Sequence, residues 1–392
     1  MRYYRFRPMS ELSIKELMYD EIFFASSNES NDPYEGKMFF EFEPDRDRWK
    51  RLIESAWVNC TFRNKNIVLE EYVNYLVKYS PLTFDEFREL GFKEIFDANN
   101  NDYSNYQDER LIKILKQYVE TYMPPERYFV SFSRKADEYL MWSHYASNHK
   151  GYCLVFQTRG KCIYQSPDNQ RTSIGRKTPN SFSPHVSTHI DVKFKMHDII
   201  YTGVQSKDTA FMCFTPYIFG RDVQDEKERI AMCEKKQLPY LEKSRFWDYE
   251  AESRILLDAP ISWLCGGRYE YTKYERLFHY DSTQLVGIIL GAKMEESDKE
   301  RIRSIIKYKV SKWYDSNTKD SKRCISNFVL FQAVLSQKQR NLEIIPIEIF
   351  GAGIPCDCEH PEFAGKYDSW KDGWYIEIEG NSVRRKKYTE DD

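Results

Sequence analysis

Apolar residues recur along the chain with two spacings, which divide it into helical and extended segments. A spacing of three to four residues is typical of an amphipathic helix, and a short unbroken apolar run is typical of a buried strand. The runs predict strands over residues 3–6, 21–26, 128–133, 152–156, 199–203, 254–257, 285–290 and 342–350. The helical spacing predicts helices over residues 11–19, 45–60, 68–79, 84–98, 109–122, 138–145, 209–236, 297–310 and 326–337.

The order of these segments predicts a mixed α+β fold with a central, twisted, mostly antiparallel sheet. Strands and helices alternate irregularly, without a regular βαβ series or a GxGxxG motif, which argues against Rossmann and barrel folds. We expect one domain over residues 1–310, with a helical insertion at about 45–126. Residues 159–188 are polar and locally basic, and predict a mobile loop that is more often a solvated excursion than a nucleic-acid contact. Residues 311–392 are expected to form a C-terminal α/β extension with a polar tail.

Composition excludes several classes of protein. The 392 residues are 41% hydrophobic, enough for a sizeable core, so a fully disordered chain is excluded. Basic and acidic side chains number 58 and 61, so any attraction for nucleic acid must be local. The nine cysteines form no CxxC pair, which argues against a disulfide framework or a zinc ribbon. Neither a signal-peptide core nor an apolar stretch of membrane-spanning length is evident, so we expect a cytoplasmic protein that does not contact the membrane.

Several sequence blocks have a recognisable character, and the most specific of them spans residues 131–156. The blocks are YYRF, FFASSNESNDPYEG, VSFSRKADEYLMWSHYASNHKGYCLVF, FWDYEAESRIL and LVGIILGAKM. Over about residues 1–310 the chain resembles a bacterial family of unknown function, domain family 2971. The resemblance implies no settled activity. The association of some members with phage defence implies a biological context but no mechanism.

Three scattered elements resemble the ADP-ribosyltransferase superfamily. In that superfamily an Arg or His lies on the first strand, a Ser or Tyr element on a later strand, and a Glu, often in Glu-x-Glu, at a strand entry. Here Arg5 lies on the first predicted strand, Ser131 and Ser133 on a later one, and Glu250 and Glu252 directly before another. The middle element lacks the usual Thr, and a long helical stretch precedes it. The resemblance implies a transferase-like fold and NAD+ as the substrate, with no metal.

Cleavage of the nicotinamide–ribose bond passes through an oxocarbenium-like state, which a nearby carboxylate stabilises. We expect Glu252 to supply that carboxylate and Glu250 to orient or deprotonate the incoming acceptor. The forked guanidinium of Arg5 is suited to grip a pyrophosphate or a ribose. Ser131 or Ser133 would then bond the nicotinamide ribose.

The segment WSHY supplies further candidates. Trp142 and Tyr145 are suited to stack on the nicotinamide ring, although Trp142 has the pattern of a core residue. His144 is a candidate acid or base near neutral pH, against the alternative of a packed, hydrogen-bonded histidine. Arg254, on the strand that follows Glu-x-Glu, is a further substrate-binding candidate.

The loop NDPYE has two interpretations of equal weight. Asn31, Asp32 and Glu35 follow a predicted buried strand, a place where binding residues often lie. Alternatively, Asn and Asp satisfy free backbone N–H groups and Pro33 begins a helical turn.

Three other segments carry weaker signals. Cys356, Cys358 and His360 are metal-ligand types, but no second cysteine pair accompanies them, so we expect no metal site. Residues 384–387, RRKK, are expected in a disordered, solvated tail. Residues 148–151 predict a turn with Gly151 at positive φ.

The leading hypothesis is an NAD+-consuming effector, an ADP-ribosyltransferase or an NAD+ glycohydrolase, in phage defence or toxin action. Its partners would be NAD+, a protein or nucleic-acid acceptor, and a regulatory partner or phage trigger. A metal-dependent nuclease or phosphodiesterase is the second hypothesis. Its carboxylate-rich Mg2+ site would use Asp32, Glu35, Glu250, Glu252 and His144.

A third hypothesis is a non-catalytic, phage-sensing adaptor. In that case Arg5 and Glu252 would form a structural ion pair with no cleft between them. The transferase hypothesis instead predicts that Arg5, Ser133 and Glu252 line one cleft of dinucleotide size.

Overall fold

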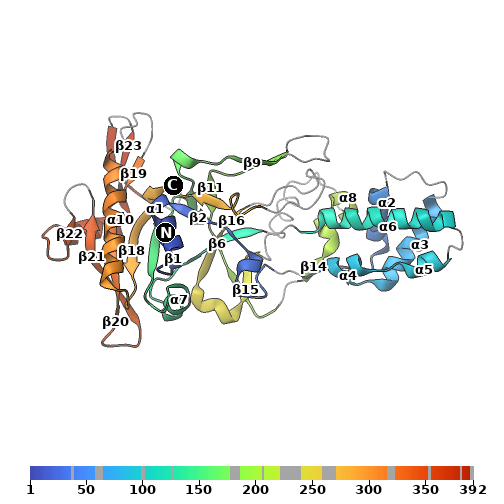
Figure 1. Ribbon diagram of the computed structural model, residues 1–392, viewed down its shortest axis with the longest axis horizontal. Coiled ribbons are helices and arrows are strands. Elements are labelled where there is room, and N and C mark those ends of the chain that lie inside the picture. The colour runs from blue at the N-terminus through green and yellow to red at the C-terminus, as the bar shows by residue number, and fades with distance from the viewer. Residues whose placement is uncertain are drawn as a thin grey trace.

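The structure, a computed structural model, shows a long molecule with a sheet at its centre. A helical lobe lies at one end and C-terminal strands lie at the other (Figure 1). The described residues are 1–36, 39–57, 65–98, 102–124, 127–176, 186–204, 207–220, 240–257, 271–315, 323–351, 355–379 and 382–388.

The central sheet is mixed and mostly antiparallel. Its strands are β1 (Arg2–Arg7), β3 (Ala25–Ser26), β6 (Tyr128–Ser133), β7 (Tyr152–Gln157), β12 (His197–Asp198), β16 (Glu252–Leu257), β18 (Leu285–Leu290), β20 (Phe328–Leu335), β21 (Leu342–Phe350) and β22 (Cys356–Asp357). Their order is β12-β16-β6-β1-β7-β18-β20-β21-β22, with β3 paired to β6 off this path. Within this order only β18 and β20 are parallel neighbours. The expected α+β class with a mostly antiparallel sheet is confirmed.

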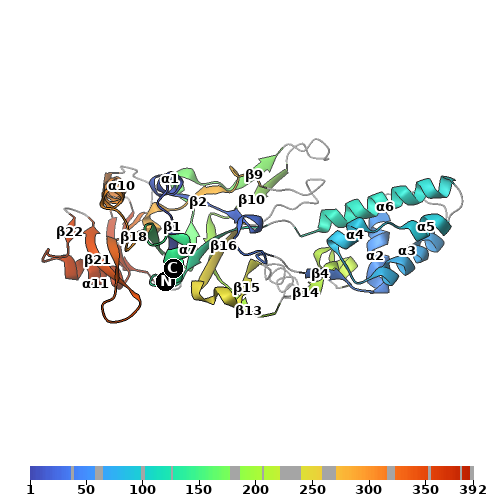
Figure 2. The same cartoon turned by 60° about the horizontal axis from the view of Figure 1, so that its bottom comes forward.

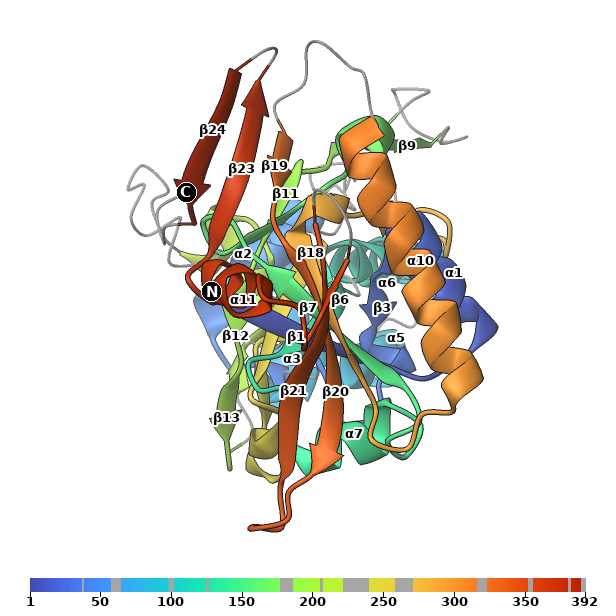
Figure 3. The same cartoon turned by 90° about the vertical axis from the view of Figure 1, so that its left-hand side faces the viewer.

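Helices cover both faces of this sheet, because its central strands carry apolar side chains on both faces. The helices are α1 (Glu11–Tyr19), α7 (Tyr139–Tyr145), α10 (Glu296–Asp315) and α11 (Phe363–Lys371). On β7, Leu154 and Phe156 join the cluster that includes residues of α1 and α10, whereas Cys153 and Val155 join the cluster that includes residues of α7 and α11. In Figure 3, α1 and α10 lie on one side of the sheet and α11 lies on the other.

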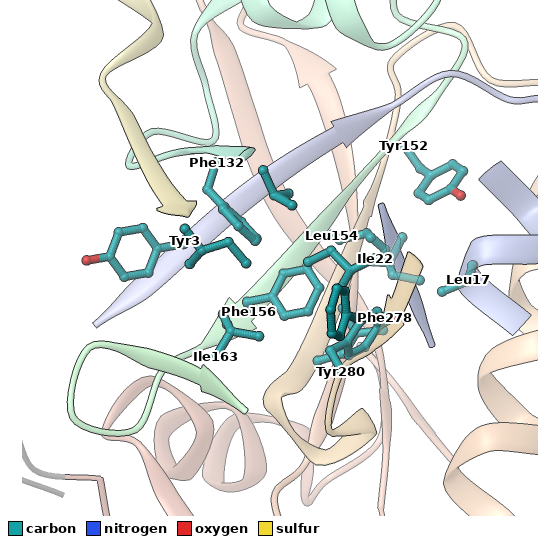
Figure 4. Packing of buried hydrophobic residues seen from close by; sticks show 14 of the residues in the cluster. Tyr3, Leu17, Ile22, Phe132, Tyr152, Leu154, Phe156, Ile163, Phe278 and Tyr280 are labelled. Carbon is teal, nitrogen blue, oxygen red and sulfur yellow. The ribbon is translucent and has the colours of Figure 1, made fainter. Parts of the chain in front are cut away.

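The larger cluster is aromatic and spans segments far apart in the sequence. Phe156 packs edge-on against Phe132 and Tyr280, with ring centroids 5.5 and 5.0 Å away. Tyr3 and Ile163 border the same cluster (Figure 4). Aromatic pairs of this geometry add to the burial term, so β1, β6 and β7 form a firm support for residues at their ends.

The helices expected within residues 45–126 form a separate lobe (Figure 2). Its helices are α2 (Arg46–Trp57), α3 (Lys65–Tyr79), α4 (Phe84–Glu89), α5 (Lys93–Ala98), α6 (Asp102–Tyr122) and α8 (Pro216–Phe219). The short strands β4 (Phe39–Phe42), β5 (Leu82–Thr83) and β14 (Lys207–Thr209) belong to it. The lobe has its own core, in which Trp49 stacks on Phe42 with centroids 4.9 Å apart.

Smaller strand pairs complete the fold. They are β2 (Glu21–Phe23) with β17 (Leu277–His279), β8 (Cys162–Tyr164) with β11 (Lys193–Lys195), β9 (Ser173–Arg176) with β10 (Val186–His189), and β13 (Ile200–Thr202) with β15 (Glu242–Ser244). A C-terminal sheet has the order β19 (Arg323–Ile325), β23 (Trp374–Glu379) and β24 (Ser382–Lys387).

Several local predictions differ from the structure. The helix predicted over 326–337 is absent, and Phe328–Leu335 form strand β20 instead, because their apolar run is buried on both faces of the sheet. The helix predicted over 209–236 is, in its described part, a 3-10 turn followed by α8, which ends at Gly220 with φ +83°; residues 221–239 lie outside the described residues. In its described part, the loop predicted at 159–188 contains strands β8 and β9 and the start of β10; residues 177–185 lie outside the described residues. Residues 384–387 lie in β24, where Lys386 pairs with buried Glu377.

Candidate functional site

The sheet splits between β1 and β6. Each of these strands pairs along its length with its outer neighbour, β1 with β7 and β6 with β16. In the described part of the chain they meet each other at one register pair only, Tyr4 opposite Ser133. At the far end of β6, Ala25 of β3 pairs with Phe129. The backbones of β1 and β6 therefore diverge, and a space opens between the two halves of the sheet.

A cavity of about 510 Å³ lies at this split. Its volume falls within the range of small-molecule sites. Strand β1 contributes Arg5, strand β6 contributes Ser131 and Ser133, and the entry to β16 contributes Glu250 and Glu252. Other lining residues include Glu29, Asn31, Glu35, His144, Tyr145 and Lys243.

Arg254 organises one wall of the cavity from behind. Its Nε and Nη2 donate to Glu252 at 2.6 and 2.9 Å, and Nη2 also donates to Glu35 Oε2 at 2.8 Å. Nη1 donates to Glu35 and, at 2.8 Å, to the carbonyl oxygen of Tyr240. Arg254 thus binds the carboxylates of Glu252 and Glu35 with two hydrogen bonds each, and every N–H of the buried guanidinium has an acceptor.

Lys243, on β15, links the two glutamates of Glu-x-Glu. Its Nζ donates to Glu250 Oε2 at 2.6 Å and to Glu252 Oε2 at 3.1 Å, and lies 3.8 Å from Glu35. The hydroxyl of Tyr145 donates to the other oxygen of Glu250 at 2.6 Å. Three buried carboxylates thus share two cations, which leaves this wall with a surplus negative charge.

The two glutamates differ in acidity. Burial by itself would raise the pKa of Glu252, but Arg254 and Lys243 outweigh it and lower that pKa to about 2. For Glu250 the burial dominates over the attraction of Lys243, and its pKa is raised. Of the pair, Glu250 is therefore the carboxyl whose pKa is moved toward neutral pH.

Arg5 lies on a different wall and has no such support. Within the described ranges its guanidinium takes part in no hydrogen bond or ion pair. Its burial and the neighbouring charge of Arg7 lower its pKa to about 10, so it is charged at neutral pH. Arg7, by contrast, pairs with Glu16. The carboxylate of Glu16 attracts the charge of Arg5 without a direct ion pair, and an anionic ligand in the cavity would stabilise that charge further.

The serines of β6 take up different positions. Ser131 interacts with the carboxylate of Glu252 through its side chain. The hydroxyl of Ser133 donates to the carbonyl oxygen of Glu250 at 2.7 Å and accepts from the backbone N–H of Lys135 at 3.0 Å. Ser133 thereby fixes the turn that presents Glu250, which is a positioning role.

Helix α7 places its candidate residues unequally. His144 is exposed and lines the cavity beside Tyr145, which is partly buried. Trp142 is fully buried in the core, with Phe6 edge-on at 5.1 Å, and its Nε1 donates to the carbonyl oxygen of Ala136. Trp142 is therefore a core residue in this structure and is not positioned to stack on a ligand.

Residues of the loop NDPYE differ in which of the two interpretations they follow. Asn31 lines the cavity and its amide donates to the Tyr145 hydroxyl at 3.2 Å. Glu35 is part of the buried charge network. Asp32 accepts the backbone N–H of Tyr34 at 2.9 Å, the geometry of an Asx turn, and serves the loop itself.

The turn after α7 is unusual in its backbone. Ser147, Asn148 and His149 all have positive φ, at 48°, 54° and 69°. Gly151 does not, contrary to the prediction from sequence; it is required because a Cβ there would lie 2.2 Å from the carbonyl oxygen of Arg7. The turn thus holds α7 against the end of β1.

Lys243 and Tyr201 are site residues that the sequence did not indicate. Tyr201, on β13, accepts the backbone N–H of Glu252 through its hydroxyl at 2.7 Å. Neither residue stands in a motif, and only the parallel pairing of β13 with β15 brings both beside Glu-x-Glu. No pattern of spacing could have identified them.

Two predicted arrangements can be compared with this geometry. Glu35, Glu250 and Glu252 converge as a metal site would require, but Lys243 and Arg254 occupy the space between them. A Mg2+ ion would have to displace two buried cations. The Arg5–Glu252 ion pair of the adaptor hypothesis is not formed among the described residues, where Glu252 pairs with Arg254 and Lys243.

Comparison with known proteins finds a family match over a segment that contains part of this site. Residues 141–255 match the model of a family described as a protein of unknown function (DUF2971). The resemblance to that family is confirmed for this segment, which runs from α7 into β16 and includes Tyr145, Lys243 and Glu250. No curated protein and no solved structure matches the chain. Among the described residues no helix combines the length and apolar character needed to cross a membrane.

Proposed function

We propose that this protein cleaves NAD+ at the nicotinamide–ribose bond, releasing nicotinamide and passing the ADP-ribosyl group to an acceptor or to water. The observation that carries the proposal is the cavity at the split in the sheet. It gathers Arg5, Ser131 and the Glu250–Glu252 pair, which lie more than a hundred residues apart in the chain.

The charge distribution in the cavity suits this substrate. NAD+ carries an anionic pyrophosphate and a cationic nicotinamide ring, and cleavage develops positive charge on the ribose. The guanidinium of Arg5 makes no hydrogen bond or ion pair among the described residues, and is suited to the pyrophosphate. The carboxylate network supplies the negative charge that stabilises the ribosyl cation.

The geometry favours an exchange of the roles expected for the two glutamates. Both oxygens of Glu252 accept from Arg254, and one of them also accepts from Lys243. Glu252 therefore anchors the wall. Glu250 is held by one bond to each oxygen, from Lys243 and Tyr145, and retains acceptor capacity for a ribose hydroxyl or an attacking nucleophile. We assign Glu250 the catalytic role and Glu252 a positioning role.

The biological setting belongs to the same proposal. The family resemblance suggests a bacterial effector in phage defence or toxin action, acting in the cytoplasm. A protein or nucleic-acid acceptor and a phage-derived trigger would then be its partners. His144, exposed at the cavity, is suited to meet such an acceptor.

The test is an assay of nicotinamide release from NAD+ by the purified full chain. It is run alone and with phage lysate, nucleic acid and a protein mixture as acceptors or triggers. Stoichiometric or catalytic release in any arm supports the proposal. Absence of release in every arm, with Mg2+-dependent cleavage of nucleic acid instead, would favour the nuclease.

Replacement of Arg5 by methionine is expected to raise the KM for NAD+ about ten- to a hundred-fold, with a smaller change in kcat. The loss of a charge-assisted bond to phosphate has this magnitude. Because Arg5 is desolvated and makes no direct hydrogen bond or ion pair among the described residues, the same change should leave the free energy of unfolding equal or higher. Steady-state kinetics measure KM and kcat, and calorimetry measures the affinity for ADP-ribose. Urea unfolding measures the free energy of unfolding.

The matched control is Arg5→Lys, which keeps the charge but loses the fork. It should give an intermediate KM. An unchanged KM in Arg5→Met, or a large loss of stability, would show that Arg5 has a structural role instead.

A further inference from the structure

A second cluster of reactive side chains lies in the C-terminal part of the fold, away from the cavity. Cys356 on β22, His360 in the following turn and Glu362 at the start of α11 bring a sulfur, an imidazole nitrogen and a carboxylate oxygen within 4.8 Å of one another. Cys356 is buried, and the other two are exposed above it.

The backbone holds these three side chains together. Cys356 pairs with Ile349 of β21, which fixes the sulfur at the edge of the central sheet. The N–H of His360 donates to the carbonyl oxygen of Asp357 at 3.1 Å. The N–H of Phe363 in turn donates to the carbonyl oxygen of His360 at 3.0 Å. A compact turn of this kind lowers the entropy cost of chelation, because the ligands are already ordered.

A cation already lies in the cluster. The ammonium group of Lys366 is 3.1 Å from Cys356 Sγ and 3.0 Å from Glu362 Oε2. The site is therefore arranged to stabilise positive charge between the sulfur and the carboxylate. Lys366 lies on α11, and its side chain is partly exposed, so its head can swing into solvent without disturbing the helix.

We propose that Cys356, His360 and Glu362 form a Zn2+ site, in which the ion takes the place of the Lys366 ammonium. Thiolate, imidazole and carboxylate are all zinc ligands, and the thiolate selects against Mg2+ and Ca2+. The imidazole would give up the 3.2 Å bond that its Nδ1 accepts from the backbone N–H of Glu362, or ligate after turning its ring. Three protein ligands leave one position of a tetrahedral ion for water.

The ion would act on the fold at this end of the sheet. It would tie β22 to the start of α11, the helix whose Trp370 packs against Phe331 with ring centroids 5.2 Å apart. Binding to the folded state alone would raise the thermal midpoint with metal concentration.

The experiment is a titration of the full chain with Co2+ as a spectroscopic probe, followed by displacement with Zn2+. A thiolate-to-cobalt charge-transfer band with one equivalent of metal is expected. Cys356→Ser should abolish the band, and His360→Ala should weaken binding about ten- to a hundred-fold, as loss of site residues commonly does. Lys366→Met should tighten binding about ten-fold, because it removes a competing positive charge.

Cys358→Ser is the matched control, since its exposed thiol lies two residues away and outside the cluster. It should leave the titration unchanged. A band that persists in Cys356→Ser, a band lost in Cys358→Ser, no band in the wild type, or weaker binding in Lys366→Met would each overturn the proposal. Far-ultraviolet circular dichroism verifies that every variant is folded.

Discussion

Replacing Glu250 with glutamine should lower the kcat for NAD+ cleavage about a thousand-fold, with little change in KM. The change removes a carboxylate charge that stabilises the ribosyl cation and can accept a proton, and each of these effects is worth orders of magnitude. The fold should persist, because a glutamine oxygen still accepts from Lys243 and Lys243 keeps its bond to Glu252. Nicotinamide release and thermal unfolding measure both properties.

The pH dependence provides a second observable for the same residue. Burial raises the pKa of Glu250 above the ordinary glutamate value, so its ionised form is lost at a higher pH than usual. The wild-type kcat should therefore fall on the acid side with this raised pKa. In Glu250→Gln that limb should be absent.

The control for this variant is Glu41→Gln. Glu41 lies in the helical lobe, where it pairs with exposed Lys207 away from the cavity. Its kinetics should match the wild type. Full NAD+ turnover by Glu250→Gln would contradict the assignment of the catalytic role to Glu250. If Glu250→Gln loses both activity and its cooperative unfolding transition, Tyr145→Phe becomes the decisive variant. It removes a hydrogen bond to Glu250 and should therefore shift the acid limb of the pH profile.

Replacing Arg254 with methionine should lower the free energy of unfolding by about 3 to 5 kcal/mol at pH 7, the usual effect of removing one member of a buried ion pair. Glu35 and Glu252 would lose the cation that holds both of them, while remaining buried. Urea unfolding monitored by tryptophan fluorescence measures the change.

The difference in free energy of unfolding between the wild type and Arg254→Met should become smaller at low pH. The pKa of Glu252 in the folded protein is about 2, below its ordinary value of 4.5. A carboxyl whose pKa is lower in the folded state than in the unfolded state stabilises the fold at pH values above its unfolded pKa. For Glu252 this stabilisation is lost as the pH falls from about 4.5 toward 2. The wild type loses this contribution on acidification, and Arg254→Met, which has already lost most of it, should lose less.

Arg301→Met is the matched control, because Arg301 also binds a glutamate, Glu11, through two nitrogens but at the surface. It should leave unfolding nearly unchanged. Arg254→Lys should lie between the two, since it keeps a charge without the fork. Equal stability of Arg254→Met and Arg301→Met would mean that the buried network does not hold the cavity wall.

The sequence by itself determined most of the strands, and several residues that it singled out line the cavity. The runs at 128–133, 285–290 and 342–350 are strands with those bounds, because an apolar run of that length has few other ways to be buried. The spacing of Glu250 and Glu252 before such a run placed both at the entry to a strand. Arg5, the serines and the glutamates, by contrast, were singled out by the resemblance to the ADP-ribosyltransferase superfamily and not by a local pattern.

Only the tertiary structure decided how these residues meet. That β1 and β6 part after Tyr4 and Ser133 depends on strand pairing across more than a hundred residues, which no local pattern records. The same holds for Lys243, which reaches the glutamates through the pairing of β13 with β15. Which of the two carboxylates retains acceptor capacity depends on where Arg254 and Tyr145 donate. Local sequence sets the period of an element, but the energy of a buried charge is set by partners that the fold brings to it.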